Sequence, residues 1–308
     1  MATDTPALAA ADRRLLLALV FAIGIFWGVN WPAMKIALGE LSPWWFRTVT
    51  IAISASGLLW LARLSGERVR LATADVRPMC AVSLFAITGW HLSTAFGLTM
   101  IESGRAVIVA FTMPVWAALV STLWLGERHS WRVVVALLLG LCGLLVLLGP
   151  DLGRLGERPL GALLVLLAAV SWAIGTVAIK ARRWSVGVLA LAGYQLLIGG
   201  VPIVLLTLWF EPVPDLSRLT WQGIVATAYG STIALIFCYA AWVKIVTLVP
   251  ATVAAMSTLL IPIVGLASSA LLLGEPAGVR ELSALALVLP ALGLVLLPRG
   301  KAPTAAEV

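Results

Sequence analysis

Charged side chains are scarce in this chain of 308 residues: they make up 11%, and only 14 of them are acidic. A soluble globular protein has about a quarter of its residues charged, so this chain lacks the charge needed to cover a soluble surface. Hydrophobic residues make up 61%, and the mean hydropathy is +1.05. The composition therefore excludes a soluble globular protein and predicts an integral membrane protein.

Cysteine and histidine are scarce too. The three cysteines, Cys80, Cys142 and Cys238, fall inside apolar segments and are odd in number, which argues against a disulfide framework. The sequence indicates no carboxylate partner for either of the two histidines, His91 and His129. They therefore indicate neither a metal cluster nor a catalytic site. The chain has no Walker motif, so the sequence does not indicate a nucleotide site. We expect no enzyme activity, no cofactor and no metal ion.

Apolar runs of about 20 residues alternate with short connections that carry Gly, Pro and charge. Runs of this length predict transmembrane α-helices rather than barrel strands, which would alternate in tens. Ten spans can be placed, at approximately residues 15–38, 44–64, 78–101, 104–125, 131–149, 160–180, 187–210, 221–247, 250–273 and 279–297. The expected fold is all-α: a polytopic membrane protein with ten transmembrane helices.

Lysine and arginine are distributed unequally between the two sides of this arrangement. The side that holds both termini receives 14 of the 21, and the other side receives seven. The positive-inside rule then places both termini in the cytoplasm. Because the basic residues lie in short loops between apolar runs, the net charge of +7 is a topology signal. We expect a lipid bilayer, and no nucleic acid, as a partner.

Two stretches of the chain repeat one another at an offset of 148 residues. FTMPVWAALVSTLWLGE begins at Phe111, and LLIPIVGLASSALLLGE begins at Leu259, so that Pro114 aligns with Pro262. FWGVNWPAMK, at residues 26–35, aligns with SWAIGTVAIK, at residues 171–180, at an offset of 145, and a three-residue insertion before the seventh span restores 148. The matching spans are five apart, so the two copies cross the membrane in opposite directions. Such inverted repeats are typical of alternating-access transporters.

The repeat divides the chain into two halves of five helices each. The first repeat is expected at residues 15–149 and the second, inverted repeat at residues 160–298, joined by an external linker at 150–159. The remaining residues, 1–14 and 299–308, are expected to be cytoplasmic tails.

This pattern resembles the drug/metabolite transporter superfamily and, within it, the EamA-type ten-span exporters. The resemblance rests on the ten spans in two halves, on Trp27-Gly28 early in the first span, and on the duplicated Pro and Leu-Gly-Glu of the fourth and ninth spans. It covers essentially the whole chain. It implies export of amino acids or other small metabolites from a bacterial inner membrane, with aromatic amino-acid exporters considered first. Nucleotide-sugar and triose-phosphate carriers, which share the ten-span plan, remain an alternative, and a channel is the alternative from another class.

Such a transporter is expected to bind its substrate near mid-span, between the halves. His91 lies there in the third span, and an ionisable side chain at that depth is a functional candidate by default. It could bond the substrate or change charge near neutral pH, or it could be a neutral side chain packed between helices. The candidate substrate-binding residues, each of which could instead serve packing, are His91, Trp27, Asn30, Trp31, Thr88, Thr112, Met113, Trp116, Trp172, Tyr229, Thr232 and Tyr239.

Pro114 and Pro262 are candidate hinges, because a proline in the middle of a helix frees a backbone carbonyl and permits bending. A static kink is the alternative. Lys35 and Arg47 lie near external span ends, where we interpret them as side chains that snorkel to the interface. Either could instead attract a substrate carboxylate or form part of an outer gate.

All 14 acidic residues lie in tails, loops or span ends. Proton- and sodium-coupled carriers commonly use an intramembrane carboxylate, so its absence favours facilitative export, with His91 as the one evident proton site. A nucleotide substrate would need several buried cations, and we expect none at the midplane. The expected partner is a small-molecule substrate; the oligomeric state stays open, and a monomer is compatible with the sequence.

Overall fold

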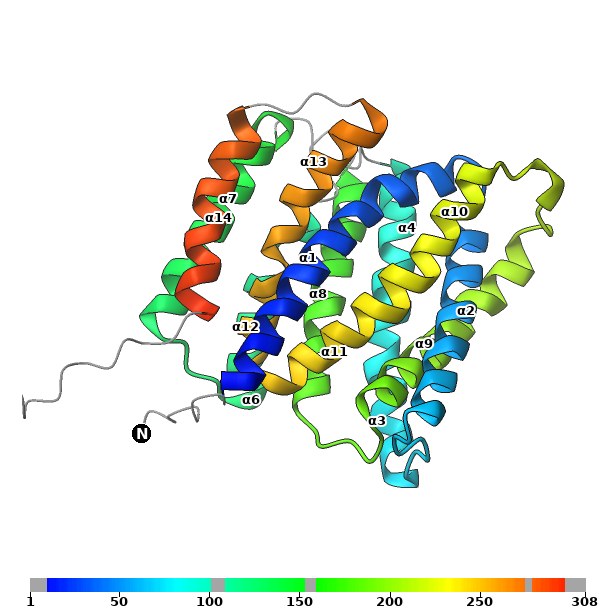
Figure 1. Ribbon diagram of the computed structural model, residues 1–308, viewed down its shortest axis with the longest axis horizontal. Helices are drawn as coiled ribbons and strands as arrows, with labels where there is room; N and C mark the ends of the chain where they lie inside the picture. The colour runs from blue at the N-terminus through cyan, green and yellow to red at the C-terminus, as the bar shows by residue number, and fades with distance from the viewer. Residues whose placement is uncertain (1–9, 101–108, 153–158, 275–278, 297–308) are drawn as a thin grey trace, which may run out of the picture.

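The computed structural model describes residues 10–100, 109–152, 159–274 and 279–296. These ranges are helical almost throughout and contain no strand (Figure 1). Seven helical segments among them are long and apolar enough to cross a membrane, and shorter apolar helices lie at Met113–Leu125 and Trp131–Gly143. The all-α, polytopic membrane fold predicted from the sequence is confirmed.

The helices described in the first half follow one another in chain order, and one of these segments is divided. They are α1 (Ala10–Leu38), α2 (Pro43–Leu64), the continuous segment of α3 (Thr73–Ser83), η1 (Leu84–Gly89) and α4 (Trp90–Met100), then α6 (Met113–Leu125) and α7 (Trp131–Leu152). The middle piece of the divided segment, η1, is a π-helix.

The second half follows the same order. It contains α8 (Pro159–Lys180), α9 (Val188–Phe210), the short 3₁₀ turn η3 (Leu216–Arg218), the continuous segment of α10 (Trp221–Tyr229), η4 (Gly230–Phe237) and α11 (Cys238–Leu248), then α12 (Ala251–Met256), the 3₁₀ turn η5 (Ser257–Leu260), α13 (Ile261–Leu273) and α14 (Val279–Leu296). Here too the middle of the divided span, η4, is a π-helix.

Helices of one half pack mainly on helices of the other. The main pairs are α2 with α9, α7 with α14, α1 with α13, and α8 with both α4 and α6. Figure 1 shows α7 and α14 side by side at one end of the molecule and α2 with α9 at the other. The second span thus pairs with the seventh and the fifth with the tenth, which fits the predicted inverted repeat.

The repeated Leu-Gly-Glu has a local structural reason. Gly126 and Gly274 end α6 and α13 with φ of 65° and 70°, the left-handed conformation that a helix C-cap commonly uses. A side chain with a Cβ is strained at this φ, and glycine is not. The motif therefore stops two equivalent helices at equivalent positions.

Each π-helix interrupts its span at the same place in the repeat: η1 ends at Gly89 and η4 ends at Phe237, 148 residues later. Side chains from neighbouring helices bond to their carbonyl oxygens. Ser171 Oγ donates to the oxygen of Phe85 at 2.8 Å, and Ser54 Oγ donates to that of Ser231 at 2.7 Å. Donors inserted in this way offset the hydrogen bonds that a widened turn loses, and π-helical turns are frequent at functional sites.

Pro114 and Pro262 each stand in the first turn of a helix, α6 or α13. Pro114 follows a turn at Phe111 and Thr112, so it does not lie in the middle of a continuous helix, whereas Pro262 follows the 3₁₀ turn η5 inside a segment that is helical from Val253 to Leu273. The first turn of an α-helix is where a missing N–H costs least and where the fixed φ suits the helix. The turn and the 3₁₀ segment lie at equivalent positions of the two repeats, and the hinge function stays a prediction.

Several acidic residues cap the ends of helices. Glu67 accepts from the N–H groups of Leu189 and Ala190 at 3.0 and 3.3 Å, in the first turn of α9. Glu40 accepts from the backbone N–H of Thr220, just before α10, at 2.8 Å. A carboxylate at a helix N-terminus satisfies unpaired N–H groups and complements the helix dipole. These carboxylates therefore have structural partners at span ends.

Candidate substrate cavity

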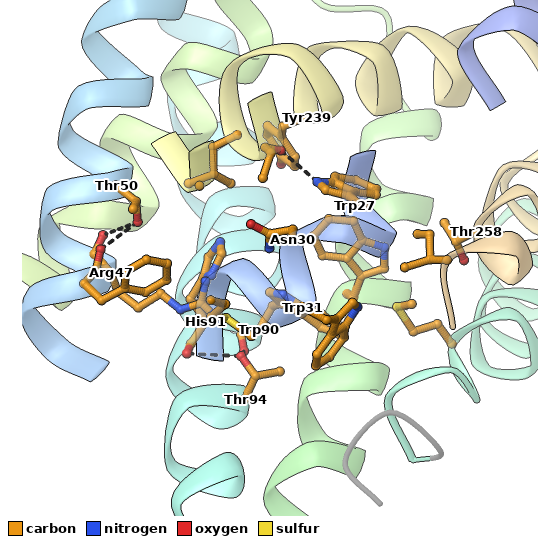
Figure 2. Close-up of a pocket in the computed structure, with 18 of the residues that line it drawn as sticks. Trp27, Asn30, Trp31, Arg47, Thr50, Trp90, His91, Thr94, Tyr239 and Thr258 are labelled. Atoms are coloured by element: carbon orange, nitrogen blue, oxygen red, sulfur yellow. Dashed lines mark hydrogen bonds between the residues drawn. The ribbon is translucent and has the colours of Figure 1, made fainter. Parts of the chain in front are cut away.

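A cavity lies between the two halves, with a volume of about 870 Å³ that includes the space at its mouth. Its walls come from α1, α2, α4 and α6 of the first half and from α8, η4, α11 and α13 of the second. Figure 2 shows Arg47 and His91 toward one end of it and Thr258 toward the other. A position between the two repeats is where such a transporter is expected to bind its substrate.

Indole rings form one wall of the cavity. Trp172, on α8, is at the centre: its ring lies 5.1 Å from that of Trp90 and 6.0 Å from that of Trp27, with Tyr239 at 6.1 Å. The ring of Trp27 is held in place because its Nε1 donates to the carbonyl oxygen of Ala234, in η4, at 2.7 Å. Aromatic contacts of this kind contribute about 0.5–1.5 kcal/mol each beyond burial. The wall is therefore aromatic and largely apolar.

Three lining residues have buried polar atoms without a hydrogen-bond partner: Asn30 Oδ1, His91 Nδ1 and Trp172 Nε1. Buried polar atoms in folded proteins are nearly always bonded, so each exception needs a reason. The side chains of His91 and Trp172 are 4% and 7% exposed. Unsatisfied donors and acceptors around an apolar cavity are the arrangement that a polar group on a bound molecule would complete.

Arg47 also lines the cavity, as one of the two alternatives given for it from the sequence would require. It is only 9% exposed, so the interpretation that it snorkels to the interface is wrong. Its Nη2 donates to Sδ of Met34 at 3.4 Å. No carboxylate pairs with it in the ranges that the structure describes. By sequence Arg47 is near a span end, but α1 and α4 cover it.

Seven of the twelve residues predicted to bind substrate lie together around the cavity, and five lie outside its lining. The seven are His91, Trp27, Asn30, Trp31, Met113, Trp172 and Tyr239; the five are Thr88, Thr112, Trp116, Tyr229 and Thr232. Their assignment to substrate binding stays a prediction.

Thr88, Thr112 and Trp116 bond within the protein. Thr88 Oγ1 donates to the carbonyl oxygen of Gly199, on α9, at 2.7 Å and so joins two helices. Trp116 Nε1 donates to Thr112 Oγ1 at 3.1 Å, one turn away on the same chain segment. These polar groups are already satisfied away from the cavity.

Tyr229 and Thr232 belong to the same span as Tyr239, but they lie outside the cavity lining. The π-helix η4 lies between them and has more residues per turn, so the register shifts before Tyr239. Tyr229 instead donates its hydroxyl to the carbonyl oxygen of Phe26 at 2.8 Å, and Thr232 is exposed. Tyr239 does reach the cavity, where its hydroxyl donates to Gln195 Oε1 at 2.5 Å.

Other lining residues were missed, among them Thr50, Thr94 and Thr258. Thr94 follows His91 by three residues and therefore shares its helix face, which is a signal that the sequence contained. Thr94 Oγ1 donates to the carbonyl oxygen of Trp90 at 2.7 Å. The hydroxyl can accept a further hydrogen bond from a ligand.

One known protein family matches both halves of the chain. The model of the EamA-like transporter family matches residues 14–149 and 159–297. The chain belongs to the EamA-like transporter family. It is therefore a membrane transporter of the drug/metabolite transporter superfamily, and the resemblance found in the sequence is confirmed.

Curated relatives carry transporter names. The uncharacterized transporter YvbV of Bacillus subtilis is 32% identical over 286 residues, which are 92% of this chain and 91% of the relative. The uncharacterized inner membrane transporter YedA of Escherichia coli is 27% identical and covers 71% of this chain and 72% of its own length. One solved crystal structure superposes with a TM-score of 0.75 at 20% identity, over 93% of this chain and 96% of the other, which supports the fold alone.

Proposed function

We propose that this family member is a secondary transporter that exports aromatic or other apolar amino acids, or similar small metabolites, by alternating access. The observation that carries the proposal is the cavity between the repeats, with a wall of indole rings and a few unsatisfied polar atoms. An aromatic side chain would pack on Trp27 and Trp172, and the polar end of the molecule would meet Asn30 and His91. A bacterial inner membrane with both termini in the cytoplasm is the location that accompanies this proposal.

Transport is proposed to be facilitative, down the concentration gradient of the substrate. The described lining contains no aspartate or glutamate. Described acidic residues such as Glu40, Glu67 and Asp75 instead bond to backbone or basic groups at helix ends, as in the 2.6 Å ion pair of Asp75 with Arg182. Ion-coupled carriers commonly rely on an intramembrane carboxylate, so this arrangement supports the uncoupled mode.

The close packing of α1 on α13 supports movement of helix pairs as units. A Cβ placed on Gly28 would lie 2.5 Å from Cβ of Val264, and one on Gly24 would lie 2.6 Å from Cδ2 of Leu260. Small residues at such positions let helices in a membrane approach closely. A paired α1 and α13 could rock against the rest of the molecule, with the turn before Pro114 and the 3₁₀ segment before Pro262 absorbing the change in angle.

The proposal is tested by efflux from proteoliposomes loaded in turn with labelled Phe, Trp, Leu, Met, Thr and a nucleotide-sugar. No ion gradient is applied at first. We expect saturable efflux of the aromatic and apolar amino acids, and slower efflux for His91→Ala. His129→Ala is the matched control, because His129 bonds to Thr122 at 2.9 Å outside the cavity.

Each other outcome removes one part of the proposal. Efflux that requires a pH gradient would contradict the facilitative mode. Flux of the nucleotide-sugar alone would contradict the substrate class. Flux that does not saturate and shows no counterflow would indicate a channel rather than a carrier.

A further inference from the structure

Arg47 is a buried cation without a described anionic partner, inside the cavity just proposed as the substrate site. Its guanidinium has five N–H donors, and the hydrogen bond found for it goes to the Sδ of Met34, a weak acceptor. A buried charge is costly unless a counter-charge or several hydrogen bonds compensate it. Nothing in the described lining supplies a negative charge. The described partners of Arg47 are thus Sδ of Met34 and the ring of Phe46, whose centroid lies 5.5 Å from Cζ, and neither carries a negative charge.

The side chains around Arg47 are donors or neutral. Figure 2 shows His91 at the same end of the cavity as Arg47. His91 Nδ1 has no hydrogen-bond partner, and no hydrogen bond joins it to the guanidinium. Trp172 Nε1 is a donor left unpaired in the lining. The positive charge of Arg47, together with these unpaired polar atoms, favours an anion.

The second repeat offers an internal comparison. At the offset of 148 residues, Arg47 corresponds to Gln195 and His91 corresponds to Tyr239. Gln195 and Tyr239 are both buried, and they bond to each other at 2.5 Å. The equivalent positions can therefore hold a neutral pair that bonds directly. In the first repeat the same two positions hold Arg47 and His91, which no described hydrogen bond joins, so a ligand could bridge them.

We propose that Arg47 binds the carboxylate of the transported molecule, and that the cavity selects its substrates by this negative charge and not by an amino group. The inference deepens the proposed function and rests on it. A guanidinium matches a carboxylate with two parallel, charge-assisted hydrogen bonds. The described cavity offers no carboxylate to an ammonium group, so an apolar acid without an amino group meets the same contacts as the amino acid. An apolar amine without a carboxylate meets an unpaired arginine.

The test uses three probes that share one phenyl group: phenylalanine, 3-phenylpropionate, which lacks the amino group, and phenethylamine, which lacks the carboxylate. Binding to the full-length protein in detergent is measured by isothermal titration calorimetry, which avoids passive leak of weak acids and amines through liposomes. We expect both carboxylates to bind and phenethylamine to bind at least about tenfold more weakly, since a charge-assisted pair is lost.

Variants assign the effect to Arg47. Arg47→Gln is expected to weaken binding of 3-phenylpropionate by about tenfold or more, and Arg47→Lys by less, because lysine keeps the charge and loses the paired geometry. Arg63→Gln is the matched control on the same helix; Arg63 is exposed and outside the cavity. Thermal unfolding and gel filtration of each variant show whether it is folded. If Arg47→Gln does not fold, Arg47→Lys still tests the site.

The outcomes separate this inference from the proposed function. Binding of phenethylamine as tight as that of the acids, full binding of the acids by Arg47→Gln, or no binding of either acid by the native protein would overturn the carboxylate site. Amino-acid efflux that is unchanged in Arg47→Gln would leave the exporter proposal standing without this site. Conversely, Arg47-dependent binding of 3-phenylpropionate in a protein that transports no amino acid would retain the site and overturn the proposed substrate.

Discussion

Removing the hydroxyl of Tyr239 is expected to destabilise the fold through Gln195. The Tyr239 hydroxyl donates to Gln195 Oε1 at 2.5 Å, and Gln195 Nε2 already lacks a partner. Tyr239→Phe would leave the whole buried amide unsatisfied. A buried polar group without a partner costs about 1–3 kcal/mol, although interhelical hydrogen bonds measured in membranes average nearer to 0.6 kcal/mol. We therefore expect a loss of about 0.5–2 kcal/mol.

The double variant Tyr239→Phe with Gln195→Leu isolates this interaction. Leucine removes the amide that the first substitution strands, so the double variant is expected to be more stable than the sum of the two single effects implies. The assay is thermal unfolding in detergent. Tyr194→Phe is the control, because the hydroxyl of Tyr194 donates to the carbonyl oxygen of Val69 and is only part-buried. An unchanged Tm for Tyr239→Phe, or strict additivity in the cycle, would refute the reasoning.

Three further predictions concern packing, a helix end and topology. Gly28→Val is expected to separate α1 from α13 and to lower both Tm and efflux, since its Cβ would lie 2.5 Å from Cβ of Val264. Ala18→Val, at an exposed position of α1, is the control. An unchanged Tm in Gly28→Val would contradict the close packing. Glu67→Gln is expected to cost about 0.5–1 kcal/mol by weakening the cap of α9, with a loss that salt reduces; equal stability at low salt would argue against it. Fluorescent tags on both termini are expected to report the cytoplasm in a bacterial host, and a periplasmic signal from either would overturn the predicted orientation.

The membrane fold could be predicted because its signals are strong and local. Apolar runs of span length, short connections and the duplicated Pro and Leu-Gly-Glu all follow from sequence, and Gly126 and Gly274 show why the motif is repeated: each ends a helix in the left-handed conformation. His91 and Tyr239 occupy equivalent positions of the two repeats, 148 residues apart, and both line the cavity.

The rest depended on geometry that the sequence does not contain. Tyr229 and Thr232 were misplaced because no pattern announces the π-helical turns of η4, which change the register. Pro114 was placed in the middle of a helix because periodicity cannot distinguish a turn before a proline from a kink at it. Arg47 was interpreted as a snorkelling side chain because its depth was judged from its distance to the span end, whereas its burial depends on the neighbouring helices α1 and α4.

The measurement that tests the central claim most directly is counterflow of labelled phenylalanine in proteoliposomes that contain the native protein, Trp172→Leu or Trp60→Leu. Trp172 contacts three other aromatic rings of the lining, whereas Trp60, on α2, is 60% exposed and lies outside the cavity. The loss of about 1–2 kcal/mol of aromatic contact is expected to slow counterflow by about tenfold in Trp172→Leu. Trp60→Leu is expected to match the native protein. Equal rates in all three, with Trp172→Leu correctly folded, would contradict a transport path through this cavity.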